Sequence, residues 1–171
     1  VQEKYKEAED DLGEAIRLSV RNAGLFINRA LARYHQNNLR GAMADYDLAL
    51  DMDPNNFIGH YNRGLLRATV GDDHNAIDDF NFVLAEEPTN TLARYNRALL
   101  YERTGKYQEA IDDLTFLIKE YPNFVYGYAL RADCKRRIGD IKGANNDDAF
   151  VERSHLDLRF GKTPKGPTKK V

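Results

Sequence analysis

One fixed interval, 34 positions long, recurs along most of this chain of 171 residues. Three kinds of residue keep it: prolines, alanines, and residues that favour the left-handed backbone of a tight turn. They are Pro54, Pro88 and Pro122; Ala8, Ala42, Ala76, Ala110 and Ala144; and Asn37, Gly71, Gly105 and Gly139. A period of this length predicts a stack of copies of one supersecondary unit, in which neighbouring copies bury each other's apolar faces.

Each copy carries the pattern of two amphipathic helices. A first helix of about 14 residues precedes the turn and is marked in the first copy by Phe26 and Arg33. A second helix follows the turn, with apolar residues at helical spacing such as Ile77, Phe80 and Leu84. The recurrent alanine lets the two helices approach closely, and the recurrent proline ends the second helix. The pattern therefore predicts an all-α fold.

These features resemble the tetratricopeptide repeat family. The sequences Tyr-Asn-Arg-Gly at 61–64 and Tyr-Asn-Arg-Ala at 95–98 are similar to those of multi-repeat members from the Bacteroidota. The resemblance implies a right-handed superhelical solenoid of antiparallel helix pairs, with about nine helices. The tryptophan that is frequent early in the family's repeat is replaced here by Phe26, His60, Arg94 and Tyr128.

The repeat divides the chain into an array over 1–160 and a flexible basic tail over 161–171. Residues 1–22 match the second helix of a truncated unit, and full units are expected at 23–56, 57–90, 91–124 and 125–158. In the last unit, the positions of Ile111, Leu114 and Ile118 carry Asn145, Asp148 and Glu152. A further helix on that face would bury charge, so we expect the array to end there.

Composition excludes several classes of function. Four lysines lie in the tail, which leaves 21 basic and 27 acidic side chains, or a charge of −6, on the array over 1–160. This balance argues against nucleic-acid binding, which needs a basic face. No apolar run approaches the ~20 residues of a membrane-spanning helix, so membrane insertion is not expected. Cys134 is the only cysteine and the four histidines lack ligand spacing, so neither a metal nor another cofactor is expected.

No constellation in the sequence predicts catalysis. The glycines fit turns and close packing rather than a phosphate-binding loop. Adjacent acidic pairs such as Asp78 and Asp79 point to different sides of a helix and do not form an acid–base pair. The chain begins at Val1 and not at a methionine, so we expect an upstream segment to have been removed. The upstream segment would decide whether the protein is located in the cytoplasm or in the periplasm or cell envelope.

The resemblance implies a concave groove lined by the first helices. The residues expected to bind a peptide there are Asn28, Asn62 and Asn96; Tyr61, Tyr95 and Tyr126; Leu65 and Leu99; and Arg136 and Arg137. Ile27, Leu31, Ile58 and Leu92 are expected on the same face. In the family, asparagines at such positions contact the ligand backbone, since an amide both donates and accepts hydrogen bonds. The alternative is that several of these side chains pack between neighbouring helices.

One ligand class of the family is not expected here. The clamp that reads chaperone C-termini uses lysine, asparagine and arginine on three successive first helices. With Asn62 in its centre the other positions are Ile27, Leu31, Leu92 and Asn96, and with Asn96 in its centre they are Tyr61, Leu65, Tyr126 and Leu130. Neither set supplies the cations that a terminal carboxylate needs.

A second series of charged residues predicts structural ion pairs. Its members are Arg29, Arg63, Arg97 and Arg131 on the first helices, and Asp45, Asp79, Asp113 and Asp147 on the second helices. Asp11 continues the aspartate series in the truncated unit. The sequence separation is the same in all four pairs and spans one turn, which places both partners at a similar height on antiparallel helices.

The sequence therefore predicts a non-catalytic scaffold that binds a protein or peptide segment in its groove. Two alternatives stay open: a structural component of a cell-envelope or secretion assembly, and a regulatory domain of a larger enzyme. In the first alternative the edges and the convex surface of the array would contact large partners.

Overall fold

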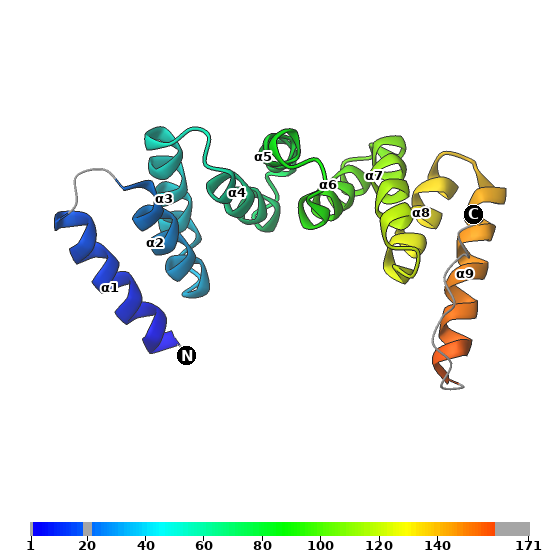
Figure 1. Ribbon diagram of the computed structural model, residues 1–171, viewed down its shortest axis with the longest axis horizontal. Coiled ribbons are helices and arrows are strands. Elements are labelled where there is room, and N and C mark those ends of the chain that lie inside the picture. Colours follow the sequence, from blue (N-terminus) through cyan, green and yellow to red (C-terminus); the bar gives the residue numbers. More distant parts are fainter. Residues whose placement is uncertain (1, 19–21, 160–171) are drawn as a thin grey trace. The chain divides into compact units, whose positions relative to one another are not determined.

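The computed structural model describes residues 2–18 and 22–159. These residues form nine helices and no strand. Figure 1 draws the helices with their labels. The helices are α1 (Gln2–Leu18), α2 (Ala23–His35), α3 (Leu39–Met52), α4 (Phe57–Thr69), α5 (Asp73–Glu86), α6 (Thr91–Arg103), α7 (Tyr107–Glu120), α8 (Val125–Arg137) and α9 (Ile141–Arg159). None of these helices has the length and apolar character needed to cross a membrane. The fold class is an all-α array of antiparallel helix pairs, and the predicted basic tail lies outside the described residues.

The turns between paired helices have the predicted backbone. Asn37 has φ of 62°, and Gly71, Gly105 and Gly139 have φ of 83°, 78° and 85°. Glycine adopts this left-handed conformation without a Cβ penalty, and asparagine tolerates it. In each turn, the following backbone N–H donates to a carbonyl five residues earlier: Asn38 to Arg33, Asp72 to Arg67, Lys106 to Tyr101 and Asp140 to Lys135. These bonds satisfy carbonyls that the ending helix leaves unpaired.

Three first helices begin in the same way. Asn22, Asn56 and Asn90 precede α2, α4 and α6, and each side-chain oxygen accepts a bond from a backbone N–H in the first turn. The donors are Gly24, Gly59 and Ala93, at 3.0, 2.9 and 2.9 Å. An N-cap of this kind stabilises a helix by about 1 kcal/mol. The helix α8 departs from this pattern, because Phe124 stands at its N-cap and provides no side-chain cap.

The chain forms two compact units, Val1–Thr89 and Asn90–Val171. In the first, each helix from α1 to α4 packs against the next one in sequence, and in the second α6 to α9 do the same. The core of the first unit includes Tyr46 and Leu66, which are 2% and 1% exposed. The core of the second includes Leu114 and Leu117. Apolar burial between adjacent helices is therefore the main source of stability in each unit.

Candidate protein-binding site

All four arginine–aspartate pairs of the predicted series are in contact. The closest nitrogen–oxygen distances are 2.6 Å for Arg29–Asp45, 2.8 Å for Arg63–Asp79, 2.7 Å for Arg97–Asp113 and 2.7 Å for Arg131–Asp147. Each arginine uses two nitrogens to contact both oxygens of its partner. The aspartates are between 1 and 3% exposed. This bidentate geometry fixes the height of each first helix against its second helix.

The carboxylates also contact further side chains that were not predicted. Arg33, Arg67 and Lys135 lie four residues after the arginines of the first, second and fourth pairs, and contact Asp45, Asp79 and Asp147 at 2.8, 2.7 and 2.8 Å. His60 and Arg94 contact Asp79 and Asp113 at 2.8 and 2.9 Å. The first three cations occupy one position of the repeat, and this recurrence was the signal that could have identified them.

The fourth pair shows the electrostatic balance at these buried carboxylates. Burial by itself would raise the pKa of Asp147, because it disfavours the charged form. Hydrogen bonds from Arg131 and Lys135 outweigh burial, so the pKa of Asp147 lies below its usual value. The group is therefore ionised at neutral pH and belongs to the framework that holds the first helices in place.

The first-helix face expected to form the groove is only partly exposed to solvent. Leu92 and Tyr126 are 64% and 76% exposed. Leu31, Ile58 and Leu99 are exposed as well, and Leu65 is half-buried. Tyr61 and Tyr95 are half-buried, with their rings edge-on to Phe80 and Phe124 at centroid distances of 5.8 and 5.2 Å.

One residue expected on this face is not there. Ile27 is 6% exposed and belongs to the core of the first unit. Its Cδ1 atom lies 3.4 Å from the place where Gly59 of α4 would carry a Cβ. The prediction for Ile27 was wrong because a glycine on the neighbouring helix leaves space that this side chain fills.

The polar residues of the expected groove differ in their surroundings. Asn28 is exposed and Asn62 is half-buried, and neither side chain makes a hydrogen bond within the described part of the chain. Asn96 is also half-buried. Arg136 contacts the carboxylates of Asp133 and Asp148, while Arg137 is exposed. These contacts compensate the charge of Arg136.

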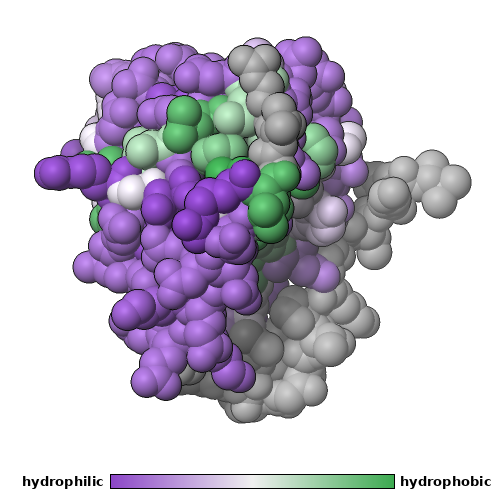
Figure 2. Space-filling view, turned by 90° about the vertical axis from the view of Figure 1, so that its left-hand side faces the viewer, coloured by the Kyte–Doolittle hydropathy of each residue, from purple (hydrophilic) through white to green (hydrophobic). Residues whose placement is uncertain are grey.

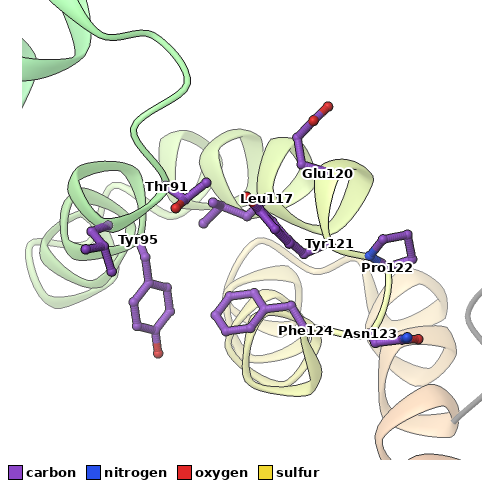
Figure 3. A pocket seen from close by; sticks show the side chains of 9 residues that line it. Thr91, Tyr95, Leu117, Glu120, Tyr121, Pro122, Asn123 and Phe124 are labelled. Carbon is purple, nitrogen blue, oxygen red and sulfur yellow. The ribbon is translucent and has the colours of Figure 1, made fainter. Parts of the chain in front are cut away.

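A pocket of about 580 Å³ lies on the second unit, where the first-helix face of α6 meets the end of α7. Thr91, Leu92 and Tyr95 line it from α6, and Leu117 and Glu120 line it from α7. The connection to α8 supplies the other lining residues, Tyr121, Pro122, Asn123 and Phe124. Figure 3 shows the side chains of Tyr95, Tyr121 and Phe124 grouped around this space. Tyr121 is 55% exposed, so an aromatic surface is accessible to a ligand.

The pocket lies where the chain departs from its own repeat. The position of Tyr121 is Asp53 and Glu87 in the two preceding units, and that of Phe124 is Asn56 and Asn90. Polar and capping residues are thus replaced by two aromatic rings. Sequence analysis missed Tyr121 and Phe124, although comparing the units for their differences would have revealed them.

Local packing accommodates the ring of Phe124. A Cβ atom at Gly127, in the first turn of α8, would lie 2.5 Å from this ring. Only glycine at that position leaves the ring where it is. The missing side-chain cap at Phe124 and the glycine at position 127 each lower the intrinsic stability of α8. Residues that lower local stability in this way are typical of functional sites.

The charge around the pocket is negative. Glu120 is exposed at its edge, and the C-terminus of α7 adds the negative end of a helix dipole. None of the described lining residues is lysine, arginine or histidine. The pocket therefore combines an apolar interior with an acidic edge.

Comparison with known proteins agrees with this fold. A family model described as tetratricopeptide repeat matches residues 1–57 and 61–123. A solved structure of MamA from Desulfovibrio magneticus RS-1 is 19% identical, with 90% of this chain and 86% of that chain covered and a TM-score of 0.81. A tetratricopeptide repeat protein from Parabacteroides merdae is 25% identical, with 94% of this chain and 68% of that chain covered and a TM-score of 0.67. A comparison with curated proteins gives no match.

The fold of the described residues is thus the one seen in solved repeat proteins, and it is a non-catalytic interaction fold of the kind that serves as a scaffold for other proteins. The family model covers well over half of the sequence. The chain belongs to the tetratricopeptide repeat family.

Proposed function

We propose that the chain binds an extended segment of a partner protein, and that the pocket on α6, α7 and the start of α8 receives an anchoring side chain of that segment. The observation that carries this proposal is the replacement of a polar residue and a helix cap by Tyr121 and Phe124 at the pocket. Two aromatic residues at a place where the repeat needs neither are best explained by a ligand that they contact.

The pocket's chemistry indicates the anchor. Leu92, Tyr95, Leu117 and Phe124 provide apolar surface, and the volume of about 580 Å³ is in the range of pockets that enclose small ligands. An aromatic or large aliphatic side chain fits this space and would lose little conformational entropy there. Buried aromatic anchors dominate the energetics of many protein interfaces.

The charge at the pocket indicates what lies next to the anchor. Glu120 and the C-terminal end of α7 favour a cation, and no basic side chain lines the pocket in the described part of the chain. The preferred segment therefore has a lysine or arginine within a few residues of its apolar anchor.

Contacts to the backbone of the bound segment would come from asparagine side chains at the pocket and on the first-helix faces. In the second unit these are Asn123 at the pocket and Asn96 on α6, with Leu99 and Tyr126 as further apolar surface. In the first unit, the equivalent face carries Asn28, Asn62, Tyr61 and Leu65. That unit has Asp53 and Asn56 in place of the two pocket aromatics, so its contacts contribute less affinity.

A selection from a library of random twelve-residue peptides tests the proposal. The full chain and its double variant Leu92→Ser, Tyr121→Ser are used as parallel baits. The proposal predicts that the wild-type chain enriches peptides with an aromatic or aliphatic anchor next to lysine or arginine, and that the double variant does not. Enrichment of the same sequences by both baits, or of acidic sequences by the wild-type chain, would contradict it.

A further inference from the structure

The first-helix face of the second unit has an apolar end at the pocket and a basic end away from it. On α8, the residues along one side of the helix are Tyr126, Leu130, Asp133 and Arg137. On α6, the equivalent residues of the repeat are Leu92, Asn96, Leu99 and Arg103. Both lines begin beside the pocket, because Leu92 and Phe124, two residues before Tyr126, line it. The face therefore leads from the pocket to the C-terminal ends of α6 and α8.

The exposure of this face does not depend on where the repeats end. The helix α6 is followed by α7, α8 and α9 in the same compact unit, and Leu92 and Leu99 on α6 are nevertheless exposed. Tyr126 and Asp133 occupy the same two positions on α8 and are exposed as well. These positions of the repeat thus remain accessible on a helix that has further helices after it.

The apolar end of the face holds two of the most exposed hydrophobic side chains. Among the large hydrophobic residues that the structure describes, Leu18, Tyr126 and Leu92 have the highest exposed fractions, at 79%, 76% and 64%. Such exposure is not general, since the surface that Figure 2 shows, on the side where α1 lies, is mostly hydrophilic with its hydrophobic residues in one patch. Exposed apolar residues that lie together are typical of interaction sites.

The basic end of the face holds one cation that is available to a ligand. Three cations lie in the last turn of α8. Lys135 contacts Asp147 at 2.8 Å, and Arg136 contacts two aspartates. Arg137 is exposed, and its side chain makes no ion pair or hydrogen bond within the described part of the chain. Of the two arginines expected in the groove, Arg137 is therefore the one that can pair with a ligand without losing another partner.

We propose that the bound segment runs along this face and carries an aspartate or glutamate that pairs with Arg137, about five residues from the side chain in the pocket. This inference rests on the proposed function, because it starts from that anchor. Tyr126 and Arg137 are eleven residues apart on α8, which corresponds to about 16 Å along the helix. An extended segment advances about 3.3 Å per residue, so it covers this length in about five residues.

The two ends of the face select opposite charges on the segment. Glu120 at the pocket favours a basic residue next to the anchor, and Arg137 favours an acidic residue at the other end. Between the ends, the exposed Leu99 and the half-buried Leu130 provide apolar contact. A segment that lies the other way round would bring like charges together, so the face fixes the direction in which a given segment binds.

A charge-reversal experiment tests the pairing. The probe is a twelve-residue peptide selected by the wild-type chain, with binding that Leu92→Ser weakens, and fluorescence anisotropy measures its affinity for the full chain. We expect an acidic residue about five positions from its apolar anchor. Arg137→Gln should weaken binding about threefold, and Arg137→Glu about tenfold, because repulsion then replaces an exposed ion pair. The peptide with lysine in place of its acidic residue should bind Arg137→Glu better than the wild-type chain.

Arg153→Glu is the matched control, since Arg153 is exposed on α9 and has no ion pair among the described residues. It should change the affinity by less than about twofold. Equal effects of Arg137→Glu and Arg153→Glu, a lysine peptide that does not prefer Arg137→Glu, or selected peptides without the acidic residue would overturn the inference and leave the pocket proposal intact. If no selected peptide depends on Leu92, both proposals fail. Circular dichroism verifies the helical fold of each variant, because a cation in the last turn also stabilises α8.

Discussion

The buried aspartates determine how each first helix meets its second helix. Asp79 is 2% exposed and its two oxygens contact Arg63, Arg67 and His60. A buried carboxylate is tolerated only because the two arginines compensate its charge, and removing it leaves their charge uncompensated. Such pairs contribute more to the specificity of packing than to net stability, since burying both charges costs solvation energy.

This arrangement predicts that substitutions of two neighbouring aspartates differ greatly in their effect on the free energy of unfolding. Asp79→Ala should lower the free energy of unfolding by about 3 kcal/mol, because Arg63, Arg67 and His60 lose their shared partner. Asp78→Ala is the matched control, since Asp78 is exposed, and should change it by less than about 0.5 kcal/mol. Denaturant unfolding followed by circular dichroism measures both, and equal effects would show that the ion-pair layer is not structural.

The lowered pKa of Asp147 predicts how stability depends on pH. Hydrogen bonds from Arg131 and Lys135 outweigh the opposing effect of burial and keep this pKa below that of an unfolded aspartate, which is about 3.9. The stabilisation is therefore complete above about pH 4 to 5 and is lost as the pH falls through the lower, folded-state pKa. Asp147→Asn should lose less stability between pH 7 and pH 3 than the wild-type chain does. Identical losses would contradict this assignment.

At the scale of the helices, the inter-helix face changes between α7 and α9. Leu114 is fully buried, and the equivalent residue of α9, Asp148, is 35% exposed at its side chain and contacts Arg136. Asn145 and Glu152, on the same face of α9, are exposed. The same position in the repeat is thus a core position in one helix and a surface position in the other.

A charge at the core position of α7 and an apolar residue at the surface position of α9 should therefore differ greatly in their effect on stability. Leu114→Asp should lower the free energy of unfolding by about 4 kcal/mol or prevent folding, because it places an unpaired charge in the core. Asp148→Leu should change it by less than about 1 kcal/mol. Thermal unfolding of both variants is the measurement, and a wild-type transition for Leu114→Asp would disprove the assigned face.

Sequence reasoning predicts the helices well and the pocket poorly, for a physical reason. Residues that recur in every full unit report what every unit needs: a left-handed turn such as that at Gly71, and a buried aspartate such as Asp79. Tyr121 and Phe124 do not recur, because they serve the pocket and not the repeat. Ile27 shows the opposite error, since its recurring position faces the core where its neighbour is Gly59.

At the scale of the whole molecule, each compact unit presents its own candidate surface. In the second unit this surface is the pocket beside α6, and in the first unit it is the equivalent first-helix face with Asn28, Tyr61 and Asn62. The pocket can be tested without disturbing the core, because Leu92 is 64% exposed at its edge. Tyr95 is less suitable for this purpose, because its ring packs on Phe124 and its truncation would also perturb the unit.

The most direct measurement is a fluorescence titration of a selected twelve-residue peptide against three forms of the full chain. Leu92→Ser should weaken binding about tenfold, the loss expected when one apolar contact at the anchor is removed. Ile58→Ser, at the equivalent exposed position of α4, should change the affinity by less than about twofold. Equal weakening by both variants, or by neither, would contradict an anchor in the pocket of the second unit.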